Sequence, residues 1–133
     1  MRRWAWAAAG GGLALLAAAA PAAPPPVEDY VLHCSGCHRQ DGAGVPGVVP
    51  ALTRLRPFLE TPAGRSYLVR VPGVAQAALD DDRLAALLNW VSSEISGVEP
   101  APPFSAGEVR ALRERPLRDP RAQRSTALGR SAQ

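Results

Sequence analysis

Two cysteines and a histidine stand together in the segment Cys34-Ser35-Gly36-Cys37-His38. Cysteines three positions apart share one helical turn, so each thiol can add to one vinyl group of the same haem. The histidine after the second cysteine then lies beneath the iron. The chain has no other cysteine. The segment therefore predicts one covalent haem c attached at Cys34 and Cys37, with His38 as the proximal axial ligand of its iron.

Three other uses of these residues fit less well. A zinc site needs four ligands, and the only histidines, His33 and His38, each stand next to a cysteine and are badly placed to complete a tetrahedron. A thioredoxin-like redox pair lies between a strand and a helix, and no strand pattern precedes Cys34. A disulfide between residues three apart would close a very small loop and stabilise the fold little.

The elements that must position this segment are all expected to be helices. The clearest helix runs from Asp80 to about Ser96, with Asp80 as its N-cap and Gly97 at its end. Shorter helices are expected from Val27 toward Cys37 and within Glu60–Val71. No segment alternates apolar and polar residues as a strand would. The sequence thus predicts an all-α fold, a small domain of three to four helices around the haem.

The two ends of the chain differ from its middle. Arg2 and Arg3 are followed by an apolar run that ends in small residues at Ala20-Pro21-Ala22, the order of a secretory signal peptide. The apolar run is about as short as a bilayer-spanning helix can be, so export with cleavage is favoured over a retained membrane anchor. We expect four parts: a signal peptide (1–22), a Pro-rich linker (23–26), a cytochrome c domain (27–98) and a basic, mostly extended or disordered tail (99–133).

Charge excludes one class of partner. Once the signal is removed, 13 Arg remain against 12 acidic residues, so the high calculated pI does not indicate nucleic-acid binding. The domain is mildly acidic and the tail is basic. Ser105 as N-cap, with Glu108 three residues on as its capping-box partner, predicts a short helix between Ser105 and Arg115. From its charge we expect at most a weak contact of the tail with an acidic partner or an anionic membrane surface.

Residues 27–98 resemble the class I, mitochondrial-type cytochromes c. The resemblance rests on the CSGCH segment, on Tyr30 four positions before it, on Gly42 and Gly44 after it, on Pro50-Ala51-Leu52, and on Trp90 in the last helix. It implies that the first and last helices cross near Tyr30 and Trp90.

The resemblance also implies further haem contacts. The carbonyl of Pro50, 12 residues after His38, would accept the Nδ1 proton of that histidine and raise its strength as an iron ligand; alternatively, Pro50 only shapes a loop. Leu52 and Tyr67 are the other residues expected beside the haem. Arginines that could pair with the haem propionates are Arg54, Arg56, Arg65 and Arg70.

One departure from the family concerns the second axial ligand. The family uses a methionine shortly before the last helix, whereas the only methionine here is Met1, and Val74 stands about where the ligand would fall. The distal ligand is thus unknown, and four alternatives stay open. The iron is five-coordinate or binds water beside Val74 and Leu79; another side chain approaches (Tyr67, Gln76 or Asn89); the mature α-amino group near Ala23 folds back; or a partner molecule supplies the ligand.

Two functions follow from this reading. The first is a non-enzymatic, exported one-electron carrier between periplasmic redox proteins such as a dehydrogenase or an oxidase. The second is a five-coordinate haem protein that binds NO, CO or peroxide, or has peroxidase-like activity. Loss of a methionine ligand lowers the reduction potential relative to His/Met cytochromes. The first function is favoured because no distal His or Arg constellation is visible.

Overall fold

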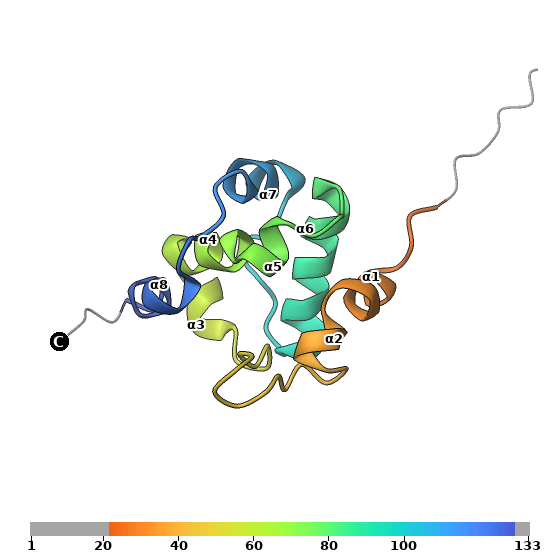
Figure 1. Ribbon diagram of the computed structural model, residues 1–133. Coiled ribbons are helices and arrows are strands. Elements are labelled where there is room, and N and C mark those ends of the chain that lie inside the picture. Colours follow the sequence, from red (N-terminus) through yellow and green to blue (C-terminus); the bar gives the residue numbers. More distant parts are fainter. Residues whose placement is uncertain (1–21, 130–133) are drawn as a thin grey trace, which may run out of the picture.

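The computed structural model describes residues 22–129, and the secondary structure of this part of the chain is helical (Figure 1). Residues 22–129 form no strand, only an isolated bridge between Val45 and Val49. The all-α prediction is confirmed, with more and shorter helices than expected. In chain order they are α1 (Pro26–His33), α2 (Ser35–His38), α3 (Arg56–Leu59), α4 (Pro62–Arg70), α5 (Pro72–Ala75), α6 (Asp81–Trp90), the π-helical η1 (Val91–Ile95), α7 (Ala106–Arg113) and α8 (Pro120–Ala127).

The expected signal peptide, apart from Ala22, lies outside the described residues. No helix within 22–129 has the length and apolar character needed to cross a membrane.

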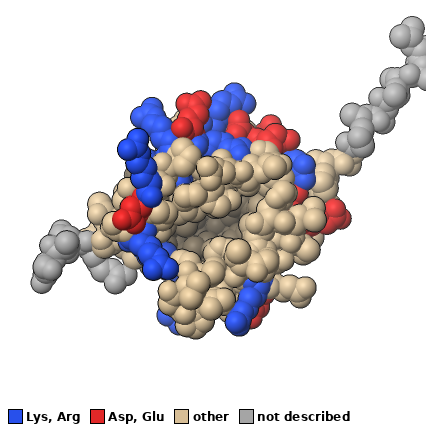
Figure 2. All heavy atoms as spheres, in the orientation of Figure 1, with Lys and Arg blue, Asp and Glu red and all other residues tan. Residues whose placement is uncertain are grey.

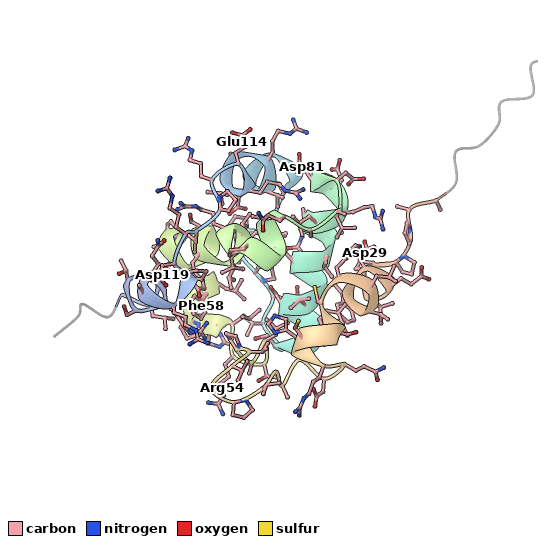
Figure 3. All side chains as sticks on the ribbon, viewed as in Figure 1. Asp29, Arg54, Phe58, Asp81, Glu114 and Asp119 are labelled. Atoms are coloured by element: carbon pink, nitrogen blue, oxygen red, sulfur yellow. The ribbon has the colours of Figure 1, made fainter. Side chains whose placement is uncertain are left out.

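α1 packs against α6, as the resemblance implies. The rings of Tyr30 and Trp90 lie with their centroids 5.4 Å apart, and the Tyr30 hydroxyl donates to the carbonyl of Arg39 at 2.6 Å. Beside this aromatic pair, the buried carboxylate of Asp29 forms an ion pair with Arg83 of α6. Figure 3 shows Asp29 on α1, on the side toward α6. The crossing therefore joins the two ends of the predicted domain through both apolar and charged contacts.

The last helix of the domain follows its sequence signals closely. The Asp80 side chain accepts from the amide of Arg83 and caps α6. At Val91 the helix widens into η1, where the Ser92 hydroxyl donates to the carbonyl of Leu88. Gly97 then ends the helix with a φ of 64°, a conformation that glycine adopts at little cost. The predicted span from Asp80 to Ser96 thus divides into an α and a π segment.

The prediction of a mostly extended or disordered tail is wrong within the described residues. α7 and α8 both lie in it, and both pack on the domain. Phe104 and Val109 join the main core, while Leu117 and Ala127 bury against Phe58 in a second cluster. The tail of the chain is thus part of the fold as far as residue 129.

Local sequence explains why this segment folds. Ser105 accepts from the amide of Glu108 and caps α7, as expected. Asp119 caps α8 in the same way through the amide of Ala122, with Pro120 at the first helical position. The few apolar residues of this segment lie on the faces that pack against the domain. Its basic composition gave no sign of this packing.

Candidate haem site

The CSGCH segment lies where α1 passes into α2. Cys34 ends α1, and α2 runs from Ser35 to His38, so one helical turn carries all three functional side chains. Cys34 is half-buried, Cys37 is exposed, and neither forms a disulfide. Burial, with the nearby negative charges of Asp29 and Cys37, raises the pKa of the Cys34 thiol to about 11. The two thiols are thus unpaired and lie on one helical turn, and the half-buried thiol of Cys34 is held protonated.

His38 makes the contact that the resemblance implies. Its Nδ1 lies 3.0 Å from the carbonyl oxygen of Pro50. A carbonyl can only accept, so Nδ1 carries the proton and donates, and Nε2 keeps its lone pair. Burial lowers the pKa of the imidazole, partly opposed by the bond to Pro50. The histidine is thereby held in the neutral tautomer that can ligate a metal through Nε2.

The loop between His38 and Pro50 is closed by glycines in positive-φ conformations. The amide of Gly44 donates to the carbonyl of His38 at 3.0 Å, and the φ of Gly44 is 68°. A Cβ on Gly44 would lie 2.4 Å from the Val49 oxygen and 2.8 Å from that of Pro50. Gly44 is therefore required where the loop returns to place the Pro50 carbonyl against His38.

A hollow opens in the face of the molecule shown in Figure 2. Compared with Figure 1, α2 and the segment 39–55 border it below, and α4 and α5 border it above. Its rim is mostly uncharged in this view, while acidic and basic side chains gather over α7 and the start of α6. A recess with a mostly uncharged rim, two free thiols and a neutral imidazole are a set that fits a covalently held haem.

Of the other predicted contacts, the structure supports a position near this loop for Leu52 but not for Tyr67. The amide of Leu52 donates to the carbonyl of Gly42 at 2.7 Å, and its side chain packs on the main core. Tyr67 belongs to the second cluster: its ring stacks on Phe58 with centroids 5.2 Å apart, and its hydroxyl donates to Pro120 at 3.1 Å. The polar group of Tyr67 is thus used in holding α8.

The candidate distal donors differ in how free they are. The side chain of Asn89 is engaged twice by Phe104: its amide donates to the Phe104 carbonyl at 3.0 Å, and its oxygen accepts from the Phe104 amide at 2.7 Å. Gln76 is exposed in the loop after α5. Val74 and Leu79, from the same region, pack on the main core as apolar side chains.

Two of the four arginines considered for the haem propionates are committed elsewhere. Arg65 is buried, forms a bidentate ion pair with Glu108 and lies over the ring of Phe104. Arg70 donates to the carbonyl of Arg115. Arg56 meets Glu60 at the surface, and Arg54 is exposed on the loop below the hollow (Figure 3).

Sequence reasoning missed contacts made by the arginines of the last two helices. Arg121 and Arg124 of α8 line a surface pocket together with Val48, Val49 and Pro50, so α8 borders the loop that supports His38. Arg113 of α7 contacts the segment after α5. The basic composition of this segment suggested an extended or disordered tail, and no local signal in the sequence marks which of its arginines contact the domain.

The fold and the site define a small c-type cytochrome, and comparison with known proteins agrees. The chain is 33% identical over 106 residues to cytochrome c-552 of Thermus thermophilus, covering 63% of this chain and 81% of that protein. Cytochrome c-552 of the Thermus thermophilus strain ATCC 27634 is also 33% identical over 106 residues, 63% of this chain and 72% of that protein. No family model matches. The chain belongs to the class I c-type cytochromes, whose cofactor is a covalent haem c with its iron.

Proposed function

We propose that this protein is an exported one-electron carrier whose haem is bound at Cys34 and Cys37 and whose iron is ligated by His38. The observation that carries the proposal is the contact of His38 Nδ1 with the Pro50 carbonyl, 3.0 Å away and 12 residues along the chain. That contact leaves Nε2 unprotonated on the helical turn that holds both thiols. Haem iron supplies a one-electron couple when bound, and no other group in the proposed site needs to react.

The residues of the site then have separate roles. Cys34 and Cys37 would hold the haem covalently, His38 would ligate its iron, and the Pro50 carbonyl, by accepting the hydrogen bond from Nδ1, would make His38 a stronger donor. Electrons would enter near the exposed Cys37, and on the preceding helix α1 Val31 and the 74% exposed Leu32 offer an apolar surface for a redox partner.

We further propose that His38 is the only ligand that residues 22–129 supply to the iron. This segment contains no methionine. The amide of Asn89 and the hydroxyl of Tyr67 are engaged by Phe104 and Pro120, which favours an open or weakly occupied distal position. A low reduction potential relative to His/Met cytochromes follows.

An open distal position also favours a second function, binding of small ligands such as NO, CO or peroxide. Val74 and Leu79, from the segment where the resemblance would place the distal ligand, are apolar and offer no acid or base for cleaving a peroxide bond. Electron transfer therefore remains the better-supported function. A reversible one-electron redox titration is the result expected for an electron carrier. Rapid consumption of peroxide in stopped-flow mixing would instead favour the peroxidase-like alternative.

The attachment is tested by haem content after expression with a c-type maturation system. Cys34→Ala with Cys37→Ala should abolish covalent haem, whereas each single variant should keep one thioether and shift the pyridine haemochrome band to longer wavelength. His38→Ala should lose haem incorporation, and His33→Ala is the matched control because His33 is exposed beside the same segment. Equal loss in both histidine variants would contradict the assigned ligand.

Partners and compartment follow from this function. We propose a periplasmic location, with export by the predicted signal peptide, and a dehydrogenase or an oxidase as the partner.

The basic tail is a poorer candidate for docking than its composition suggests, because Arg113 and Arg124 are only partly exposed and contact the domain. A contact with an acidic partner would fall to the exposed Arg115, Arg118 and Arg121.

A further inference from the structure

Arg113, near the end of α7, reaches into the loop that joins α5 to α6. Its Nε donates to the carbonyl of Ala75 at 3.0 Å, Nη2 to Ala77 at 2.7 Å, and Nη1 to Leu79 at 2.8 Å. Nη1 also lies 3.2 Å from Oδ1 of Asp81. One guanidinium thus binds the carbonyl of Ala75, the last residue of α5, and the carbonyls of Ala77 and Leu79 in the loop that follows.

The loop held in this way matters because of where it lies. α5 borders the hollow opposite α2 and the segment that carries Pro50 (Figures 1 and 2). Val74, Ala77 and Leu79 pack apolar side chains on the main core, and the carbonyls of Ala77 and Leu79 accept from Arg113. The loop therefore continues from a helix at the edge of the hollow proposed to hold the haem.

The helix that carries Arg113 is itself firmly anchored. Val109 is fully buried in the main core, and Glu108 forms the bidentate ion pair with Arg65 of α4. The Arg113 side chain is only 16% exposed. Charge-assisted bonds from a fixed, partly desolvated guanidinium are stronger than exposed ones, so α7 can hold the loop in one position.

We propose that Arg113 is a positioning residue that keeps the α5–α6 loop closed over the distal side of the haem and so limits access of external ligands to the iron. This inference rests on the proposed haem site and adds a role for the tail helix. It assigns no chemistry to Arg113, which acts only through the backbone of residues 75–79.

Two measurements on the holoprotein test the proposal. In Arg113→Ala, which loses all of these bonds, imidazole should associate with the oxidised protein at least about tenfold faster, since even one charge-assisted bond is worth about that factor. Hydrogen exchange followed by mass spectrometry should show faster exchange of the amides in 74–80 and unchanged exchange in α1. Arg113→Lys, which keeps the charge but cannot reach three carbonyls, should lie between wild type and Arg113→Ala in both measurements and guards against misfolding of the alanine variant.

Arg110→Ala is the matched control. Arg110 is on the same helix and pairs with the same Asp81, but its side chain is 70% exposed and contacts no carbonyl of the loop. It should behave as wild type in both measurements. Equal imidazole rates in wild type, Arg113→Ala and Arg113→Lys would overturn the positioning role, and so would equal acceleration in Arg110→Ala.

Failure of the haem site itself would look different. Covalent haem in the denatured protein reports on Cys34 and Cys37 and does not depend on Arg113. If the protein carries covalent haem but substituting Arg113 changes neither the imidazole rate nor the hydrogen exchange, the positioning role fails and the haem site stands. If wild-type protein carries no covalent haem, both proposals fail.

Discussion

At the scale of single residues, the proximal side of the site depends on the placement of one carbonyl. His38 is oriented by the oxygen of Pro50, and Gly44 permits that oxygen to approach because a side chain at this position would collide with it. A histidine that donates to an acceptor binds ferric iron more strongly than one that does not. The reduction potential of the protein should thus be sensitive to residues that do not ligate the iron.

This dependence gives a first prediction. Gly44→Ala should displace the Pro50 carbonyl, weaken its bond to His38, raise the reduction potential and lower thermal stability. Gly47→Ala is the control, since Gly47 has a similar φ of 75° but no atom within 4 Å of an added Cβ. It should cost about 1 kcal/mol of backbone strain without changing the potential. Equal potentials in the two variants, measured by redox titration, would contradict the assigned role of Pro50.

At the scale of elements, the last two helices are built into the domain. Tyr67 of α4 contributes to this through its hydroxyl bond to Pro120, at the start of α8. Tyr67→Phe should therefore destabilise the protein by about 1 kcal/mol and leave its optical spectrum unchanged. Thermal unfolding and absorption of the holoprotein check both parts. A changed spectrum would instead return Tyr67 to the haem pocket, where sequence reasoning had expected it.

The contact between α6 and α7 should depend on pH. Arg110 and Arg113 lower the pKa of Asp81, which lies beside α7 in Figure 3. A lowered pKa in the folded state stabilises the protein above the ordinary aspartate pKa of about 4, and that contribution is lost as the pH falls through the folded value. Asp81→Asn should thus be less stable than wild type at pH 7, and the difference should shrink below about pH 4.

Asp82→Asn serves as the control for this prediction. Asp82 lies in the same first turn of α6 and is exposed, so it shares the favourable interaction with the helix N-terminus. The stability of both variants is measured by chemical denaturation across this pH range. A similar pH-dependent loss of stability in both would mean that the helix dipole rather than the arginines causes the effect.

At the scale of the whole molecule, local signals and distant contacts were predictable to different degrees. The CSGCH segment, the Asp80 cap and the Gly97 stop are encoded by neighbouring residues, and the structure contains each helix that they predict. The packing of the tail was not predictable, because its few apolar residues become informative only when the faces of α7 and α8 meet α4 and α6. The bonds of Arg113 to the carbonyls of residues 75, 77 and 79 could not be predicted for the same reason.

The central claim is that one haem is attached at the CSGCH segment and that the protein supplies a single iron ligand. The most direct test is the optical spectrum of the mature holoprotein, oxidised and reduced, together with the pyridine haemochrome of the denatured protein. The account predicts a covalent haem c with a broad high-spin spectrum in the reduced state. A sharp low-spin α band without added ligand would show that a second side chain ligates the iron and would contradict it.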